Sequence, residues 1–186
     1  MSIIKTDFPG LLIVEPLVFE DSRGYFYESY NEKTFLAEGI DIKFVQDNQS
    51  RSSYGVIRGL HYQLAPHAQT KLIRVIQGTI LDVAVDIRKG SPSYGKVFTI
   101  ELSAENKKQL LIPKGFAHGY AVLTASAEVF YKCDAFYNRE AEAGIIYNDA
   151  HLLIDWKIPA DKAIISDKDL NHPGLTHSKN NFVFER

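Results

Sequence analysis

Four short segments of the chain place polar side chains of chemically useful types among apolar, strand-like residues. They read DSRGYFYE, VQDNQSRS, RGLHYQ and IPKGFAHGY, and they begin at residues 21, 45, 58 and 112. Imidazoles such as those of His61 and His118 ordinarily titrate at about pH 6.5, so either one is able to move a proton near neutral pH. Guanidinium groups such as those of Arg23 and Arg58 bind anionic ligands through paired hydrogen bonds. Acid–base chemistry on a charged ligand is the activity that these residue types indicate.

Each of these signals has a simpler structural explanation when it is taken alone. A single histidine near a strand more often forms a structural hydrogen bond, and a single arginine is more often solvated. Tyr131 and Tyr137 fit barrel-wall aromatics whose hydroxyls reach the rim. Arg58 and His61 stand three residues apart on a strand-like segment, which predicts that their side chains leave on opposite faces. The residues by themselves leave a structural and a functional interpretation open.

These segments need a scaffold, and the chain shows a clear strand signal. In ILDVAVDI (80–87) the alternation predicts a half-buried strand, with one face formed by Leu81, Val83, Val85 and Ile87 and the other by Ile80, Asp82, Ala84 and Asp86. KLIRVIQ (71–77) is predicted to be its hairpin partner through the turn at 77–79, and VFTIEL (97–102) and QLLIP (109–113) are further short strands. Short helices are expected at 31–38 and near 161–170. Many short strands predict a sandwich or barrel, whose interior is able to hold one ligand.

The composition is that of one folded domain, which we expect to span residues 1–186. The formal net charge of −2 and the pI of about 6.3 give no basic field that would hold a nucleic acid or an anionic membrane. The single cysteine, Cys133, excludes an internal disulfide, and the apolar stretches are too short for a signal peptide or a membrane span. We therefore expect a soluble cytoplasmic protein.

Taken together and in this order, the segments resemble the dTDP-4-dehydrorhamnose 3,5-epimerases. The resemblance also covers QTKLIRVIQGTILDVAVDIRKGSPSYGK (69–96) and SDKD (166–169), so it runs almost from end to end. Several long motifs in the correct order are a far more specific signal than any one of them. The resemblance implies an all-β fold, a cupin-like jelly-roll barrel with a few short peripheral helices.

The resemblance also implies a role for each polar residue. The family's general base corresponds to His61, its supporting carboxylate to Asp169 and its opposing proton donor to Tyr131. We assign stabilisation of the enolate oxygen to Lys71, with help from His118, and we assign stacking on the thymine to Tyr137. Contacts to the nucleotide and sugar carry over to Arg23, Glu28, Gln46, Asp47, Asn48, Arg58, Lys71, His118, Glu142 and Lys168.

The implied reaction inverts carbons 3 and 5 of dTDP-4-keto-6-deoxyglucose in deoxysugar biosynthesis of the rhamnose type. It proceeds by deprotonation to an enolate and reprotonation from the other face, without a cofactor and without a metal. The implied assembly is a homodimer in which N-terminal strand residues, in the aromatic segment 25–30, cross to the partner. The sequence departs from the family at Asp167, where Glu is more usual, and from His172 onward, where the match is loose.

Three other functions share features with this one. A metal-dependent cupin usually presents a His-x-His pair on one strand, but this chain reads His61-Tyr62-Gln63 there. A non-catalytic sugar-nucleotide-binding barrel would need no base, carboxylate partner and opposing phenol together. A sibling enzyme that epimerises carbon 3 alone, or acts on a related dTDP-4-keto sugar, is left open by the sequence.

Overall fold

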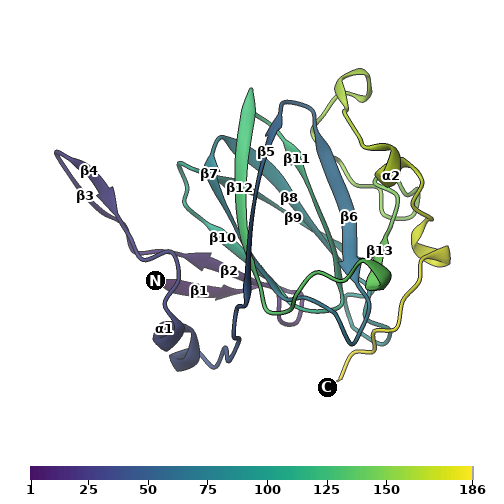
Figure 1. The fold of residues 1–186 in the computed structure, drawn as a ribbon, viewed down its shortest axis with the longest axis horizontal. Coiled ribbons are helices and arrows are strands. Elements are labelled where there is room, and N and C mark those ends of the chain that lie inside the picture. The colour runs from purple at the N-terminus through teal and green to yellow at the C-terminus, as the bar shows by residue number, and fades with distance from the viewer. Residues whose placement is uncertain (186) are drawn as a thin grey trace.

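The computed structural model describes residues 1–185, and most of its strands form two antiparallel sheets that pack face to face (Figure 1). Across the six-stranded sheet the order is β1 (Ser2–Lys5), β2 (Leu12–Glu15), β10 (Gln109–Ile112), β7 (Lys71–Gln77), β12 (Ser126–Cys133) and β5 (Gln46–Ser53). Across the five-stranded sheet it is β13 (Glu142–Gly144), β6 (Ile57–Gln63), β11 (Phe116–Val122), β8 (Thr79–Asp86) and β9 (Val97–Ser103). The predicted all-β, cupin-like fold is confirmed, although over the described residues the two sheets do not close into one continuous barrel.

The remaining elements are short and peripheral. Helix α1 (Glu32–Ala37) lies in the predicted place, and the Asn31 side chain caps it by accepting hydrogen bonds from two backbone N–H groups of the first turn. The helical stretch expected near 161–170 is divided into the 3-10 turn η2 (Ala160–Lys162) and helix α2 (Asp167–Leu170), because Ile164 between them forms a bridge with Val56. Two further 3-10 turns are η1 (Arg139–Ala141) and η3 (Leu175–His177). Within residues 1–185 no helix has the length and apolar character needed to cross a membrane.

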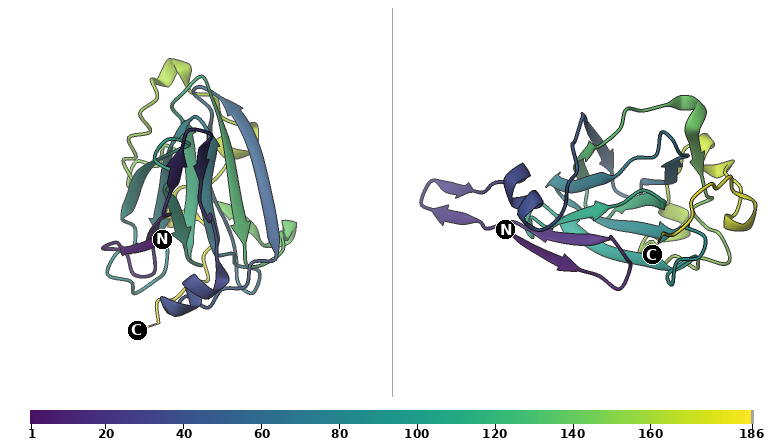
Figure 2. Two further views of the ribbon diagram at one scale, coloured as in Figure 1. Left: turned by 90° about the vertical axis from the view of Figure 1, so that its left-hand side faces the viewer. Right: turned by 90° about the horizontal axis from the view of Figure 1, so that it is seen from below.

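A separate two-stranded hairpin, β3 (Phe19–Asp21) and β4 (Gly24–Phe26), extends away from both sheets (Figures 1 and 2). It belongs to the N-terminal part of the chain and ends in the segment that leads to α1. All six of its strand residues are exposed. In the single chain the hairpin therefore projects from the two sheets, with the Lys107 Nζ 4.5 Å from the centroid of the Tyr25 ring.

Strand β8 is buried on both faces, so the prediction of a half-buried strand is wrong. On one face Ile80 and Ala84 belong to the core between the two sheets. On the other face Leu81 and Val83 belong to a second core, to which the C-terminal segment contributes Trp156. The alternation correctly predicts two faces, but it does not reveal that a C-terminal segment distant in sequence covers the outer one.

Strands β7 and β8 are not hairpin partners, which corrects a second prediction. Strand β7 pairs with β10 and β12, whereas β8 pairs with β9 and β11 in the other sheet. The turn between them carries the chain from one sheet to the other, and Gly78 adopts a positive φ of 77° there. A Cβ at this position would lie 2.1 Å from the Ser126 carbonyl oxygen, so the corner requires glycine.

A β-bulge in β6 decides which way its polar side chains point. His61 lies opposite His118 and Arg58 lies opposite Tyr120, so three steps along β6 match two steps along β11. The extra residue cancels the expected alternation, and both Arg58 and His61 line the same cavity. The prediction that they leave on opposite faces is therefore wrong.

The bulge rests on a glycine in direct contact with the neighbouring strand. Gly59 has a φ of 124°, and a Cβ on it would lie 2.5 Å from the Gly119 Cα and 2.8 Å from the His118 carbonyl oxygen. Real Cβ atoms do not approach backbone so closely, so neither the conformation nor the space accepts another residue.

We expect Gly59→Ala to lower the free energy of unfolding by roughly 3 kcal/mol or more, because it combines a strained φ with a backbone clash. Gly90→Ala is the matched control, since Gly90 also has a positive φ, of 86°, but nothing lies within 4 Å of its added Cβ. That control should cost about 1 to 2 kcal/mol. Urea unfolding measures both, and equal losses in the two variants would contradict the role given to the Gly59 contact.

Candidate active site

Polar side chains gather at one end of the space between the two sheets. Two adjoining cavities share His61, Lys71 and Tyr131. His61 comes from β6 in the five-stranded sheet, whereas Lys71 and Tyr131 come from β7 and β12 in the six-stranded sheet. A molecule bound here would therefore be approached by protein groups from two sides. The other lining residues are Ser50, Arg58, His118, Gly119 and Tyr120 in one cavity and Tyr62, Gln63, Gln69, Tyr137 and Glu142 in the other.

His61 is paired with a buried carboxylate. Its Nε2 lies 2.7 Å from Oδ1 of Asp169, which is 3% exposed. Asp169 is directed inward by α2, whose N-cap Ser166 accepts a hydrogen bond from the Asp169 backbone N–H at 3.2 Å. The second carboxylate oxygen accepts a hydrogen bond from the Gly59 N–H at 3.2 Å, so the bulge also holds the carboxylate. With Nε2 engaged, Nδ1 is the ring nitrogen of His61 that remains for a ligand.

The pKa of the Asp169 carboxyl is lowered from its usual 3.8. Burial by itself would raise it, but the hydrogen bond and charge of His61 and the Gly59 N–H together outweigh burial. Asp169 is thus an ionised partner that fixes the orientation of the imidazole.

A second imidazole–carboxylate pair lies beside the first. His118 stands directly opposite His61 in the β6–β11 ladder, and its Nε2 is 3.0 Å from both carboxylate oxygens of Asp82. Asp82 is fully buried on β8. The sequence predicts that Asp82 lies on a strand face, but it does not indicate a role for Asp82 in the site. An acidic residue on a strand face that continues with Ile80 and Ala84 is the signal that could have found it.

Lys71 and Tyr131 bring an ammonium group and a phenol into the same cavity. The Lys71 Nζ lies 5.9 Å from the centroid of the Tyr131 ring. Burial lowers the pKa of Lys71, against smaller upward contributions from Cys133 and Asp82. Burial also raises the pKa of Tyr131 to about 12, so the phenol is neutral at pH 7. The cavity therefore contains a desolvated amine, whose charged form burial disfavours, beside a phenol that keeps its proton.

Several of the predicted binding residues meet at the rim of the cavity. Glu142 is the centre of this group, because Tyr137 donates to its Oε2 at 2.9 Å and Lys168 donates to its Oε1 at 2.5 Å. Gln46 accepts a hydrogen bond from the Tyr137 backbone N–H at 3.0 Å and donates to Asn48 at 3.0 Å. These contacts link β5, the segment after β12 and α2 around one opening.

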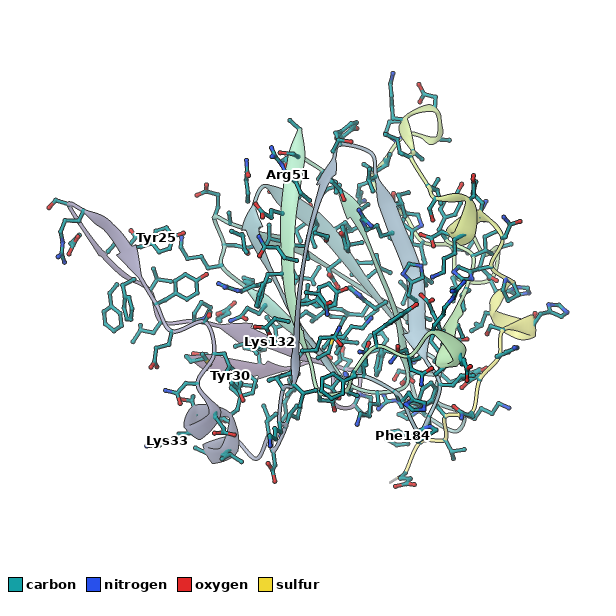
Figure 3. All side chains as sticks on the ribbon, viewed as in Figure 1. Tyr25, Tyr30, Lys33, Arg51, Lys132 and Phe184 are labelled. Atoms are coloured by element: carbon teal, nitrogen blue, oxygen red, sulfur yellow. The ribbon has the colours of Figure 1, made fainter. Side chains whose placement is uncertain are left out.

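Three predicted contacts are not brought to this cavity within the single chain. Arg23 lies on the projecting hairpin with its side chain 87% exposed, and Glu28 is exposed between the hairpin and α1. Asp47 forms an ion pair with Lys132 at 2.9 Å (Figure 3 labels Lys132). Because side chains alternate along β5, Asp47 faces away from the side on which Asn48 approaches the cavity.

His172, which the sequence analysis did not assign, lies next to the His61–Asp169 pair. Its Nε2 is 3.7 Å from Asp169 Oδ1, and its ring centroid is 5.6 Å from that of His61. It follows Asp169 by three residues, a spacing that brings side chains together across a helical turn.

His61, Asp169 and His172 offer ligand atoms within 4.8 Å of one another, and two imidazoles with a carboxylate form a donor set that suits divalent transition metals. The 2.7 Å contact between His61 and Asp169 is nevertheless a hydrogen-bond distance. Two ligands of a tetrahedral zinc ion stand roughly 3.3 Å apart. The geometry of this pair is therefore that of a hydrogen-bonded imidazole and carboxylate, and the prediction of no metal stays a prediction.

The chain is similar to proteins of one enzyme family over most of its length. The family model described as dTDP-4-dehydrorhamnose 3,5-epimerase matches residues 5–177. The dTDP-4-dehydrorhamnose 3,5-epimerase of Shigella flexneri is 54% identical over 172 residues, which cover 92% of this chain and 94% of that protein.

Solved structures give the same result. The crystal structure of dTDP-4-dehydrorhamnose 3,5-epimerase from Elizabethkingia anophelis matches with a TM-score of 0.90 and 53% identity, covering 95% of this chain and 97% of the other. The dTDP-6-deoxy-D-glucose-3,5-epimerase of Legionella pneumophila, solved in complex with dTDP-4-keto-L-rhamnose, matches with a TM-score of 0.90 and 47% identity, covering 95% and 93%.

We expect Asp169→Asn to lower the free energy of unfolding by about 1 to 3 kcal/mol at pH 7, because it removes the charged partner of two hydrogen bonds. Since the pKa of this carboxyl is depressed in the fold, its stabilising effect is present above the unfolded value of 3.8 and is lost as the pH falls through the folded value. The difference from the native protein should therefore shrink below about pH 4.

Urea unfolding at pH 7 and at about pH 3 measures this change. Asp161→Asn is the control, because the Asp161 side chain is 75% exposed and should show no such dependence. An Asp169→Asn deficit of the same size at both pH values would contradict the depressed pKa.

Proposed function

The chain belongs to the dTDP-4-dehydrorhamnose 3,5-epimerase family, and we propose that residues 1–186 form one epimerase domain with His61 as its base. Its reaction inverts carbons 3 and 5 of dTDP-4-keto-6-deoxyglucose in rhamnose-type deoxysugar biosynthesis. The observation that supports the mechanism is that His61 of the five-stranded sheet is paired with Asp169 of α2, while Tyr131 enters the same cavity from the six-stranded sheet.

Deprotonation is the first step at each carbon. The ketone at carbon 4 makes the protons on carbons 3 and 5 acidic, and an imidazole with an ordinary pKa of about 6.5 is suited to remove them near neutral pH. Asp169 holds Nε2 of His61, which directs Nδ1 to the sugar. Its carboxylate also stabilises the imidazolium that forms when the proton is taken.

Deprotonation leaves an enolate with negative charge on the carbon 4 oxygen. Lys71 supplies a positive charge in a desolvated cavity, where electrostatic attraction is stronger than in water. His118 adds a second group on the opposite sheet, oriented by the buried Asp82 through its Nε2. Together Lys71 and His118 form the site for the oxyanion.

Reprotonation must come from the other face of the ring if the carbon is to be inverted. Tyr131 lies on β12, across the cavity from His61 on β6. With a pKa of about 12 its phenol carries the proton at pH 7 and delivers it to the enolate carbon. No cofactor and no metal takes part in this scheme.

The nucleotide is bound by the remaining polar residues. Arg58 and Lys168 at the mouth of the cavities are suited to the diphosphate, and Tyr137 to stacking on the thymine. The other proposed contacts are Arg23, Glu28, Gln46, Asn48 and Glu142, whereas Asp47, which pairs with Lys132 and faces away from this cavity, is not among them.

We propose that two copies of the chain form a homodimer. Phe19, Tyr25 and Phe26 on the projecting hairpin are 59, 59 and 67% exposed, which is unfavourable in an isolated chain (Figure 3 labels Tyr25). Packing the hairpin on a partner would cover these rings and carry Arg23 toward the partner's cavity. The enzyme is proposed to act in the cytoplasm, without a nucleic-acid or membrane partner.

Turnover of dTDP-4-keto-6-deoxyglucose in D2O should place deuterium on both carbon 3 and carbon 5, because the Tyr131 hydroxyl that reprotonates each carbon exchanges its proton with solvent. His61→Asn should lower this labelling by about 10²- to 10⁴-fold, the usual contribution of a general base. Nucleotide binding should stay close to native in that variant, since other side chains hold the nucleotide. NMR of the recovered sugar measures the label, and calorimetry with dTDP measures binding.

Tyr131→Phe is the matched variant on the other face, and it should retain exchange catalysed by His61 while forming little inverted product. In the native protein, deuterium on carbon 3 alone would show that the protein is a 3-epimerase. The absence of label on both carbons, with intact dTDP binding, would overturn the epimerase mechanism in favour of a sugar-nucleotide-binding protein.

Light scattering should give a mass of twice 21.0 kDa. Arg23→Ala should keep this mass but raise the KM for the nucleotide sugar by roughly tenfold, the effect of losing one charge-assisted contact of about 1.4 kcal/mol. Arg51→Ala is the control, because Arg51 is exposed on β5. A monomeric mass at micromolar concentration, or equal KM values in both variants, would contradict the proposal that the hairpin packs on the partner and brings Arg23 to the partner's cavity.

A further inference from the structure

The His172 ring fills a narrow space next to the His61–Asp169 pair. It follows α2 and lies against Gly144, where a Cβ would come within 2.6 Å of three ring atoms of His172. Gly144 in turn lies opposite His61 in the β13–β6 ladder. The glycine at this position therefore leaves the space in which His172 packs beside the base.

One of the two ring nitrogens of His172, Nε2, is buried without a partner. Among residues 1–185, Nε2 of His172 forms no hydrogen bond, and it stands 3.7 Å from Asp169 Oδ1. Leaving a buried nitrogen unpaired costs about 1 to 3 kcal/mol. Contacts of this kind in a ligand-free site are often long and shorten when the substrate binds.

The groups that face His172 determine its charge. They are His61 on β6, Glu142 at the start of β13, and Lys168 and Asp169 on α2. Burial lowers the pKa of His172, the charge of His61 lowers it further, and Asp169 opposes both. His172 is therefore a neutral ring at pH 7, able to offer an N–H to Asp169 but not a second positive charge.

We propose that His172 is a positioning residue that shares the Asp169 carboxylate with His61 and so sets the pH at which His61 becomes free to accept a proton. This inference rests on the role of His61 proposed above. Asp169 Oδ1 faces both Nε2 atoms, at 2.7 Å from His61 and 3.7 Å from His172. A donor from His172 takes part of the carboxylate charge and so weakens the stabilisation that Asp169 gives to the His61 imidazolium.

The sign of the effect follows from this competition. In His172→Leu the space stays filled and excludes water, but the carboxylate acts on His61 alone and stabilises its imidazolium form more strongly. We expect the midpoint of His61 titration to rise by about 0.5 to 1 pH unit, which corresponds to a three- to tenfold loss of kcat/KM on the acid side. At higher pH, where His61 is neutral in both proteins, kcat/KM should be nearly unchanged.

His172→Gln keeps an N–H donor and should restore a near-native profile. His151→Leu is the control, because His151 also lies near a carboxylate, that of Asp149 at 3.5 Å, but its side chain is 70% exposed. Imidazole NMR titration of the full-length protein, with the pH profile of kcat/KM, measures each variant.

The native protein supplies a test that does not depend on any variant folding. The ring signals of His61 and His172 should titrate as a coupled pair, each sensing the protonation of the other. Independent titration of the two rings, or an unchanged His61 midpoint in folded His172→Leu, would overturn the proposal. If the two rings titrate as a coupled pair but their midpoints do not match the pH profile of kcat/KM, the shared carboxylate is supported. The role of His61 as the base is then contradicted.

Discussion

The close approach of Gly59 to Gly119 is the contact on which the geometry of the cavity depends. It allows the bulge in β6 that turns Arg58 and His61 to the same side. The same bulge aims the Gly59 N–H at Asp169, so the backbone that positions the base also holds its carboxylate. A side chain on Gly59 would disturb both relations at once, because they share one peptide unit.

The two imidazoles of the site are neighbours across one strand pair, yet their carboxylates have different origins. Asp82 comes from β8, which lies between β11 and β9 in the five-stranded sheet, and is fixed by the sheet itself. Asp169 comes from a four-residue helix in the C-terminal segment, which packs on the outer face of that sheet through Trp156 and Phe182. The His118 pair is thus part of the sheet, whereas the His61 pair depends on how the C-terminal segment docks.

Burial gives the remaining groups their chemical character. Lys71 and Tyr131 lie where the core between the sheets meets the cavity, and desolvation moves the pKa values of an ammonium and a phenol in opposite directions. The same low-polarity surroundings that keep Tyr131 protonated strengthen the attraction of Lys71 for an enolate. One apolar core therefore supports both halves of the proposed proton transfer.

The sequence by itself determined the all-β class, the short helix after Asn31 and the family, because turn residues, alternation and ordered motifs are local properties of the chain. It also named His61, Lys71, Tyr131 and Asp169, which the fold brings together. The tertiary structure alone decided that β7 and β8 lie in different sheets and that β8 is buried on both faces. It also revealed the bulge in β6 and the place of His172 beside Asp169. These features depend on which distant segments pair and pack, and strand pairing is set by long-range contacts that no local pattern records.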